Sequence, residues 1–106
     1  MTVLVKDNEE MLRYEISFDG ELVGFVEYER GPGSIAFLYT EIDPRYRGRG
    51  FGHRLVAHAV ETSREAGLSI EPQCAFVRTY VDRHPAVPSA ASRQRLGGGA
   101  SDAQTC

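Results

Sequence analysis

Apolar and polar residues alternate along the first third of the chain, which is the pattern of strands with one buried face. From Tyr14 to Phe18 every second residue is apolar, and we expect a strand there. A tight-turn signal at residues 19–21 leads into a second predicted strand over residues 22–29. The short apolar segment at residues 3–5 is either a frayed first strand or an unstructured lead-in.

A longer apolar segment follows and predicts the centre of the sheet. Residues 35–43 are almost continuously apolar and end at Pro44, as expected of a central strand covered on both faces. Beyond a glycine-rich loop, apolar residues recur at helical spacing through Glu65, and residues 68–71 predict a fourth strand. A helix between two strands implies a crossover, so these two strands should pair in parallel.

One mixed α/β domain accounts for this pattern. We expect an antiparallel β-meander, then a β-α-β crossover, then a C-terminal helix over residues 74–84 with an apolar face. The 106 residues suit one domain with a modest core, which we assign to residues 1–85. Residues 86–106 contain no aromatic residue and no periodicity, so we predict a disordered tail.

The overall charge argues against some kinds of partner. Net charge is -3 at pH 7, which does not suit a general nucleic-acid or anionic-membrane surface. No apolar run approaches the roughly 20 residues of a membrane span, and the first ten residues lack the basic and apolar parts of a secretory signal. We therefore expect a cytoplasmic protein whose cysteines, Cys74 and Cys106, are reduced thiols.

Positive charge is nonetheless concentrated in the glycine-rich loop that precedes the first helix. Glycine at three alternate positions leaves no Cβ atoms to keep a ligand off the backbone N–H groups, and the helix adds the positive end of its dipole. We predict an anion site of the phosphate-binding kind; the alternative is a solvated basic face. The arginines are Arg45, Arg47, Arg49 and Arg54, and the glycines are Gly48, Gly50 and Gly52.

Two common phosphate-binding motifs do not fit this loop. A P-loop requires Lys and Ser or Thr after its last glycine, whereas Gly52 is followed by His53 and Arg54. The dinucleotide-binding fingerprint would need its third glycine at position 53. Three antiparallel strands before the loop also leave no room for a doubly wound sheet.

The loop Arg47-x-x-Gly50-x-Gly52, between a strand and a helix in a β-β-β-α-β-α order, resembles the signature Gln/Arg-x-x-Gly-x-Gly/Ala of the GNAT superfamily of acetyl-CoA-dependent N-acetyltransferases. Within it, the chain is similar to the small stand-alone minimal acetyltransferases. The resemblance runs from about residue 13 to residue 85. It also rests on residues 39–44, 72–77 and 83–85.

This resemblance implies a GNAT-like fold and a coenzyme site. In that family the loop amides hold the pyrophosphate of coenzyme A, and the preceding strand pairs with the pantetheine arm. Either Arg45 or Arg49 would meet the 3′-phosphate, a choice that the sequence leaves open. The residues assigned in this way to acetyl-CoA are Ile42, Arg47, Gly48, Arg49, Gly50, Phe51, Gly52 and His53.

Cys74 is a candidate catalytic residue. It stands at or just before the first turn of the last helix, where the helix dipole favours a thiolate. The alternative is a buried small apolar residue, which is the common fate of a free cysteine. The resemblance implies a cysteine near the acetyl thioester. Acetyl then passes either through Cys74 to an amine, or directly from acetyl-CoA to an attacking amine.

Glu41 is the second candidate catalytic residue, as a base for the incoming amine. A carboxylate at the end of a buried strand is unfavourable unless it is paired or near a cleft mouth, so the alternative is an ion pair with a neighbouring arginine. The chain departs from the minimal family at Tyr39, where that family usually has histidine. Proton transfer must then use Glu41, Tyr39 or water, or be impaired.

We therefore expect an N-acetyltransferase that acts on a primary amine of a protein, peptide or polyamine, because the short chain lacks insertions that would wall off a small-molecule pocket. We expect a monomer or weak dimer with no nucleic-acid or membrane partner. No metal is implied, since no cluster of His, Cys, Asp and Glu has ligand spacing. Two alternatives stay open: a coenzyme A-binding module without turnover, and a nucleic-acid-binding domain that uses the cluster from Arg45 to Arg54.

Overall fold

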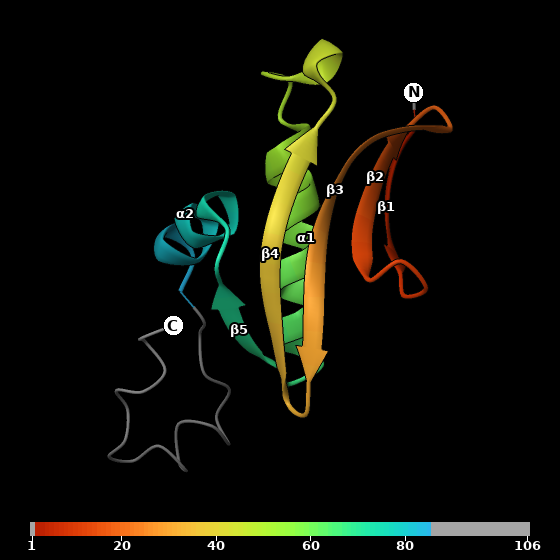
Figure 1. Cartoon of the computed structure of the whole chain (residues 1–106). Coiled ribbons are helices and arrows are strands. Elements are labelled where there is room, and N and C mark those ends of the chain that lie inside the picture. Colours follow the sequence, from red (N-terminus) through yellow and green to blue (C-terminus); the bar gives the residue numbers. More distant parts are fainter. Residues whose placement is uncertain (1, 86–106) are drawn as a thin grey trace.

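The described part of the chain forms one five-stranded sheet with two α-helices (Figure 1). The structure is a computed structural model and describes residues 2–85. This mixed α/β architecture confirms the predicted fold class, while the tail predicted over residues 86–106 lies outside the described residues. The elements are β1 (Val3–Asn8), β2 (Arg13–Phe18), β3 (Glu21–Gly31), β4 (Ser34–Ile42), η1 (Pro44–Tyr46), α1 (Phe51–Glu65), β5 (Ser69–Pro72) and α2 (Ala75–Arg83).

The strands lie in the sheet in the order in which they occur in the chain. β1 to β4 pair antiparallel, and β5 pairs parallel to β4 across the α1 crossover, as the sequence predicts. The segment left open at residues 3–5 belongs to a strand, since β1 pairs with β2 from Val3↔Phe18 to Asn8↔Arg13. The Asn8 side chain helps to close this hairpin by accepting a hydrogen bond from the Met11 amide at 3.1 Å.

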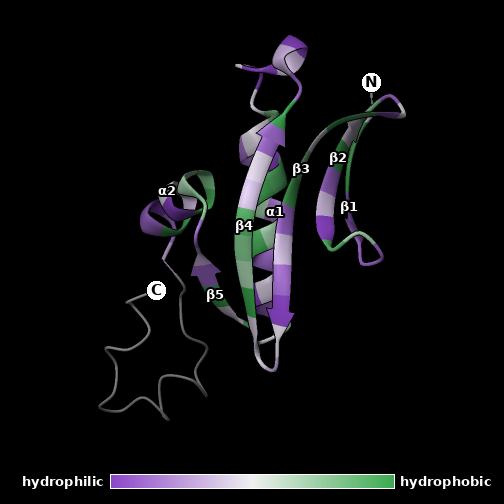
Figure 2. Ribbon diagram, viewed as in Figure 1, coloured by the Kyte–Doolittle hydropathy of each residue, from purple (hydrophilic) through white to green (hydrophobic). Residues whose placement is uncertain are grey.

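Both helices pack on one face of the sheet. α1 lies behind β3 and β4 (Figure 1), and Figure 2 shows hydrophobic residues of α1 beside these two strands. Side chains without exposed surface, such as Val26, Phe37, Leu55 and Val60, form the core between them. Full burial of such a side chain stabilises the fold by roughly 1.5–3 kcal/mol. Neither helix of the described chain is long and apolar enough to cross a membrane.

β4 contains a bulge at Leu38. Tyr28 of β3 pairs with Phe37 and Glu27 pairs with Tyr39, so Leu38 has no partner in β3. Leu38 and Tyr39 are 39% and 51% exposed. The prediction of a strand covered on both faces is therefore wrong for the part of β4 that begins at Leu38. No element among residues 2–85 covers the face of the sheet opposite α1.

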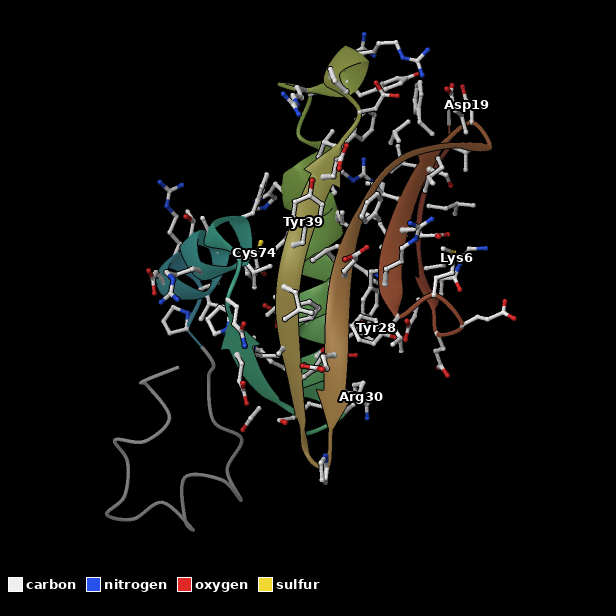
Figure 3. All side chains as sticks on the ribbon, in the orientation of Figure 1. Lys6, Asp19, Tyr28, Arg30, Tyr39 and Cys74 are labelled. Carbon is white, nitrogen blue, oxygen red and sulfur yellow. The ribbon has the colours of Figure 1, made fainter. Side chains whose placement is uncertain are left out.

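The bulge changes which residues of β4 face the helices. Beyond it, Thr40 pairs with the fully buried Val26, and Ile42 is itself buried. Tyr39 and Glu41 point to the opposite face of the sheet, and Figure 3 shows the Tyr39 ring on the side of β4 away from α1. Beyond the bulge, Thr40 and Ile42 therefore face the helices, and Tyr39 and Glu41 face the uncovered side of the sheet.

Candidate functional site

A cavity of about 560 Å³ lies at the end of β4, bounded by the glycine loop, the start of α1 and one residue of α2. Its wall contains all but one of the residues that the sequence assigns to acetyl-CoA. The exception is Arg49, which does not line it. The lining residues are Tyr39, Thr40, Glu41 and Ile42 of β4, Tyr46, Arg47, Gly48 and Gly50 of the loop, Phe51, Gly52 and His53 of α1, and Phe76 of α2.

The cavity opens where β5 leaves β4. The parallel pairing ends at Phe37↔Pro72, and the amides of Gln73 and Cys74 both donate to the Phe37 carbonyl at 3.1 Å. The chain then turns away into α2. Beyond Phe37, the edge of β4 on the β5 side faces the cavity instead of another strand of the described sheet. This edge can therefore pair with an extended ligand.

The glycine loop presents backbone N–H groups to the cavity. Gly48 and Gly50 have φ angles of 79° and 85°, which are left-handed conformations that favour glycine. A Cβ atom at either position would meet nothing within 4 Å, so the space beside the loop is open. Gly50 is the N-cap residue of α1 and provides no side chain to cap the first N–H groups of the helix. Free donors at a helix N-terminus, together with the helix dipole, favour binding of an anion.

A network of side chains holds the segment before the loop. The Arg45 guanidinium contacts Asp43 and Glu21 at 2.9 Å each, and the hydroxyl of Tyr46 donates to Glu21 at 3.1 Å. Asp43 also accepts from the Arg45 amide at 2.9 Å. Hydrogen bonds from the side chain and amide of Arg45 lower the pKa of Asp43. Arg45 is therefore already neutralised by two carboxylates.

The other loop arginines have different environments. Arg47 turns back and donates from Nε to the Ile42 carbonyl at 3.3 Å. The Arg49 guanidinium lies 5.3 Å from the centre of the Tyr46 ring, a cation–π contact. Neither these two nor Arg54 forms an ion pair within residues 2–85. Positive charge without an ionic partner therefore remains at Arg47, which lines the cavity, and at Arg49 and Arg54.

Cys74 lies beside the cavity, in contact with one of its lining residues. It is the N-cap residue of α2 and is 9% exposed, and its Sγ is 3.0 Å from Oγ1 of Thr40. Figure 3 shows Cys74 next to β4. The sequence indicated no role for Thr40, because its orientation depends on the bulge at Leu38. Burial fits the interpretation of Cys74 as a small apolar core residue, whereas the polar partner fits its interpretation as a catalytic residue.

Glu41 is exposed on the opposite face of the sheet. Its partner is Tyr39, whose hydroxyl donates to Oε1 of Glu41 at 2.7 Å. This hydrogen bond and the negative charge of Glu41 raise the pKa of Tyr39. The predicted alternative of an arginine partner is wrong within residues 2–85, where no ion pair includes Glu41. The same part of the chain holds no group of three or more His, Cys, Asp and Glu placed to bind a metal ion.

Comparisons with solved structures show a common fold. Ard1 from Thermoplasma volcanium is 19% identical, with a TM-score of 0.56 over 78% of this chain and 60% of that chain. The ribosomal-protein-S18-alanine N-acetyltransferase from Escherichia coli is 16% identical, with a TM-score of 0.59 over 76% and 61%. The chain thus spans about three fifths of the length of both proteins.

A further match is PaiA N-acetyltransferase from Thermoplasma acidophilum in complex with coenzyme A, which is 17% identical with a TM-score of 0.55 over 76% of this chain and 55% of that chain. The search of curated proteins found no significant match. A model of the GCN5-related N-acetyl-transferase family matches residues 13–90, which include the glycine loop, β4, β5 and α2. Because that match extends over more than half of the sequence, the chain belongs to the GCN5-related N-acetyl-transferase family.

Proposed function

We propose that this protein transfers an acetyl group from acetyl-CoA to a primary amine. The observation that carries the proposal is the cavity at the end of β4, which has phosphate-binding geometry at one end and reactive side chains near the other. The PaiA structure in complex with coenzyme A supports this ligand for the fold. We assign the pyrophosphate to the amides of residues 48–53, because the Arg47 amide already donates to the Pro44 carbonyl. We assign the pantetheine arm to the open edge of β4 beside Ile42.

The ion pairs of Arg45 help to choose between Arg45 and Arg49 as the residue that binds the 3′-phosphate of the coenzyme. A guanidinium held by two carboxylates would have to leave them to bind a phosphate, whereas Arg49 has no such competitor within residues 2–85. We therefore assign the 3′-phosphate to Arg49.

Two chemical routes use the residues at the reactive end. In the direct route, the amine nitrogen bonds to the thioester carbon and the carbon–sulfur bond breaks. Glu41 accepts the proton that the amine loses and releases it to solvent, while the departing thiolate takes up a proton from solvent and becomes the coenzyme thiol. The hydrogen bond from Tyr39 orients the Glu41 carboxylate for this step. In the covalent route, the Cys74 sulfur bonds first to the carbonyl carbon and releases the coenzyme thiol, and the amine then displaces Cys74.

Contacts in the structure support both routes. Cys74 is almost buried but has a hydroxyl partner in Thr40, which lines the cavity. Glu41 lies at the cavity and remains exposed to solvent on the face of the sheet that no helix covers. This exposure favours an amine on a protein, peptide or polyamine over a metabolite that needs an enclosed pocket. The Escherichia coli structure named above is of an enzyme for a ribosomal protein.

Intact mass spectrometry after incubation with acetyl-CoA distinguishes the routes. The covalent route predicts the gain of one acetyl group by the wild type and no gain by Cys74→Ser. Transfer to an amine acceptor without acetylated protein, and with Cys74→Ser still active, would instead establish the direct route. In that case Glu41→Gln should reduce turnover by about 100-fold, within the usual range for a general base.

A coenzyme A-binding module without turnover is the second candidate function. The specific observation in its favour is Tyr39, which stands where the minimal family usually has histidine and whose phenol is held neutral by Glu41. Release of free coenzyme A from acetyl-CoA in the presence of a library of amines tests this candidate. A rate no higher than without amines, together with measurable coenzyme binding, would favour the module over the enzyme.

A further inference from the structure

Four aromatic side chains form a continuous surface beside the cavity. Phe76, Tyr80 and His84 are spaced by four residues on one side of α2, and His53 of α1 lies against them. The rings of Tyr80 and His84 are stacked, with centroids 4.4 Å apart and planes at 26°. His53 is 5.7 Å from the Tyr80 ring and 6.1 Å from the His84 ring. We call these four residues the aromatic wall.

The aromatic wall begins inside the cavity and continues outside it. Phe76 and His53 line the cavity, whereas Tyr80 and His84 do not. Phe76 lies directly on the start of α1, since a Cβ atom at Gly52 would be 2.3 Å from its Cζ atom. The wall therefore begins at the start of α1, next to the glycine loop, and extends along α2 towards the C-terminal end of that helix.

The centre of the wall is fixed and its ends are exposed. The Tyr80 hydroxyl donates to Oε2 of Glu61 at 2.8 Å, and burial together with this bond raises the pKa of Tyr80 to about 12, so the ring is a neutral phenol. His53, Phe76 and His84 are exposed to solvent. Packing of the core thus accounts for the position of Tyr80 but not for the exposed rings beside it.

We propose that the aromatic wall binds the adenine base of the coenzyme by stacking, an inference that rests on the proposed function. If the pyrophosphate binds the loop and the thioester points to Thr40 and Cys74, the adenosine end must leave the loop on the other side. The aromatic wall is the surface that continues outside the cavity from Phe76 and His53, next to the loop. A base that stacks on an aromatic side chain typically loses about 5- to 100-fold in affinity when the side chain is replaced by alanine.

Binding of two ligands to the full chain tests this subsite. Coenzyme A carries the adenosine part, whereas 4′-phosphopantetheine has the same arm and one phosphate without it. Isothermal titration should show that His84→Ala weakens coenzyme A binding by about 10-fold and leaves 4′-phosphopantetheine binding unchanged. His84→Phe should keep wild-type affinity for coenzyme A within about 3-fold, because it retains a ring for stacking. His58→Ala is the matched control. His58 is exposed like His84, but it lies on α1 and packs on Tyr14, with ring centroids 6.1 Å apart.

The possible failures can be told apart. Equal weakening of both ligands by His84→Ala would overturn the subsite, because a structural role would not distinguish them. An unchanged affinity of His84→Ala for coenzyme A would overturn it as well, and so would a His84→Phe variant as weak as His84→Ala. In each of these cases the wild-type protein still binds coenzyme A, so the coenzyme site on which the proposed function rests is not affected. A wild-type protein that binds neither ligand would remove both proposals.

Discussion

Valine at position 50 should abolish coenzyme binding while leaving the protein folded. Gly50 has a φ of 85° and no atom within 4 Å of an added Cβ, so the substitution introduces backbone strain without a clash in the free protein. Strain of a non-glycine residue in the left-handed region is about 1–3 kcal/mol, and we take about 2 kcal/mol for a β-branched side chain. This is smaller than the roughly 5–15 kcal/mol that stabilises a typical domain.

Gly33 provides a matched control at the other end of β4. It lies in the turn between β3 and β4, with a φ of 80° and again nothing within 4 Å of an added Cβ. Gly33→Val should therefore carry the same strain as Gly50→Val. At roughly 4–8 °C for each kcal/mol in a domain of this size, both variants should melt about 8–16 °C below the wild type.

Thermal denaturation followed by circular dichroism, and titration with coenzyme A below both transitions, provide the two measurements. We expect the melting temperatures of the two variants to agree within a few degrees. Only Gly50→Val should lose affinity for coenzyme A, by at least about 30-fold, since its side chain occupies the space beside the loop amides. Equal affinities of the two variants for the coenzyme would refute the assignment of the pyrophosphate to this loop.

Three further predictions concern single side chains near the cavity. Hydrogen bonds from Arg45 lower the pKa of Asp43 in the folded protein below its ordinary value of 3.8. The ionised carboxylate therefore stabilises the fold at pH values above 3.8. This stabilisation is lost as the pH falls through the pKa of Asp43 in the folded protein. Melting curves should therefore show Asp43→Asn below the wild type at pH 7 and equal to it near pH 2. Glu41→Gln should bring the pKa of Tyr39 down towards 10.0, because the carboxylate that favours the neutral phenol is gone; NMR titration of the ring would contradict this if the pKa stayed raised. Thr40→Val should slow alkylation of Cys74 by iodoacetamide several-fold at pH 7, because a hydroxyl partner at 3.0 Å is lost; an unchanged rate would mean that the contact does not influence the thiol.

Local signals in the sequence predicted the scaffold and the loop correctly. Alternation from Tyr14 to Phe18 has a period of two residues because one face of β2 packs on α1, and the structure contains this strand as expected. The alternate glycines predicted an open turn before α1, and the structure gives Gly48 and Gly50 the left-handed backbone that glycine adopts without strain. These features depend on interactions within a few residues, which a single sequence records directly.

Features that depend on contacts between distant segments could not be predicted. The bulge at Leu38 depends on the register between β3 and β4, which cannot be predicted from the periodicity of one strand. The orientation of Thr40 towards Cys74 was missed for this reason. Similarly, Arg45 belonged to the basic cluster by sequence, but Glu21, which is 24 residues away, partly neutralises it.

The unpaired Leu38 determines which side of the sheet each later residue of β4 faces. If Leu38 paired with Glu27 and the bulge were lost, Thr40 would move to the exposed face, and Tyr39 and Glu41 would turn towards the helices. Deletion of Leu38 would instead keep the pairs Glu27↔Tyr39 and Val26↔Thr40, so every side chain of the site would stay on its own side of the sheet. The separation of the thiol from the carboxylate is therefore a property of the pairing between β3 and β4, and a shorter β4 without the bulge would preserve it.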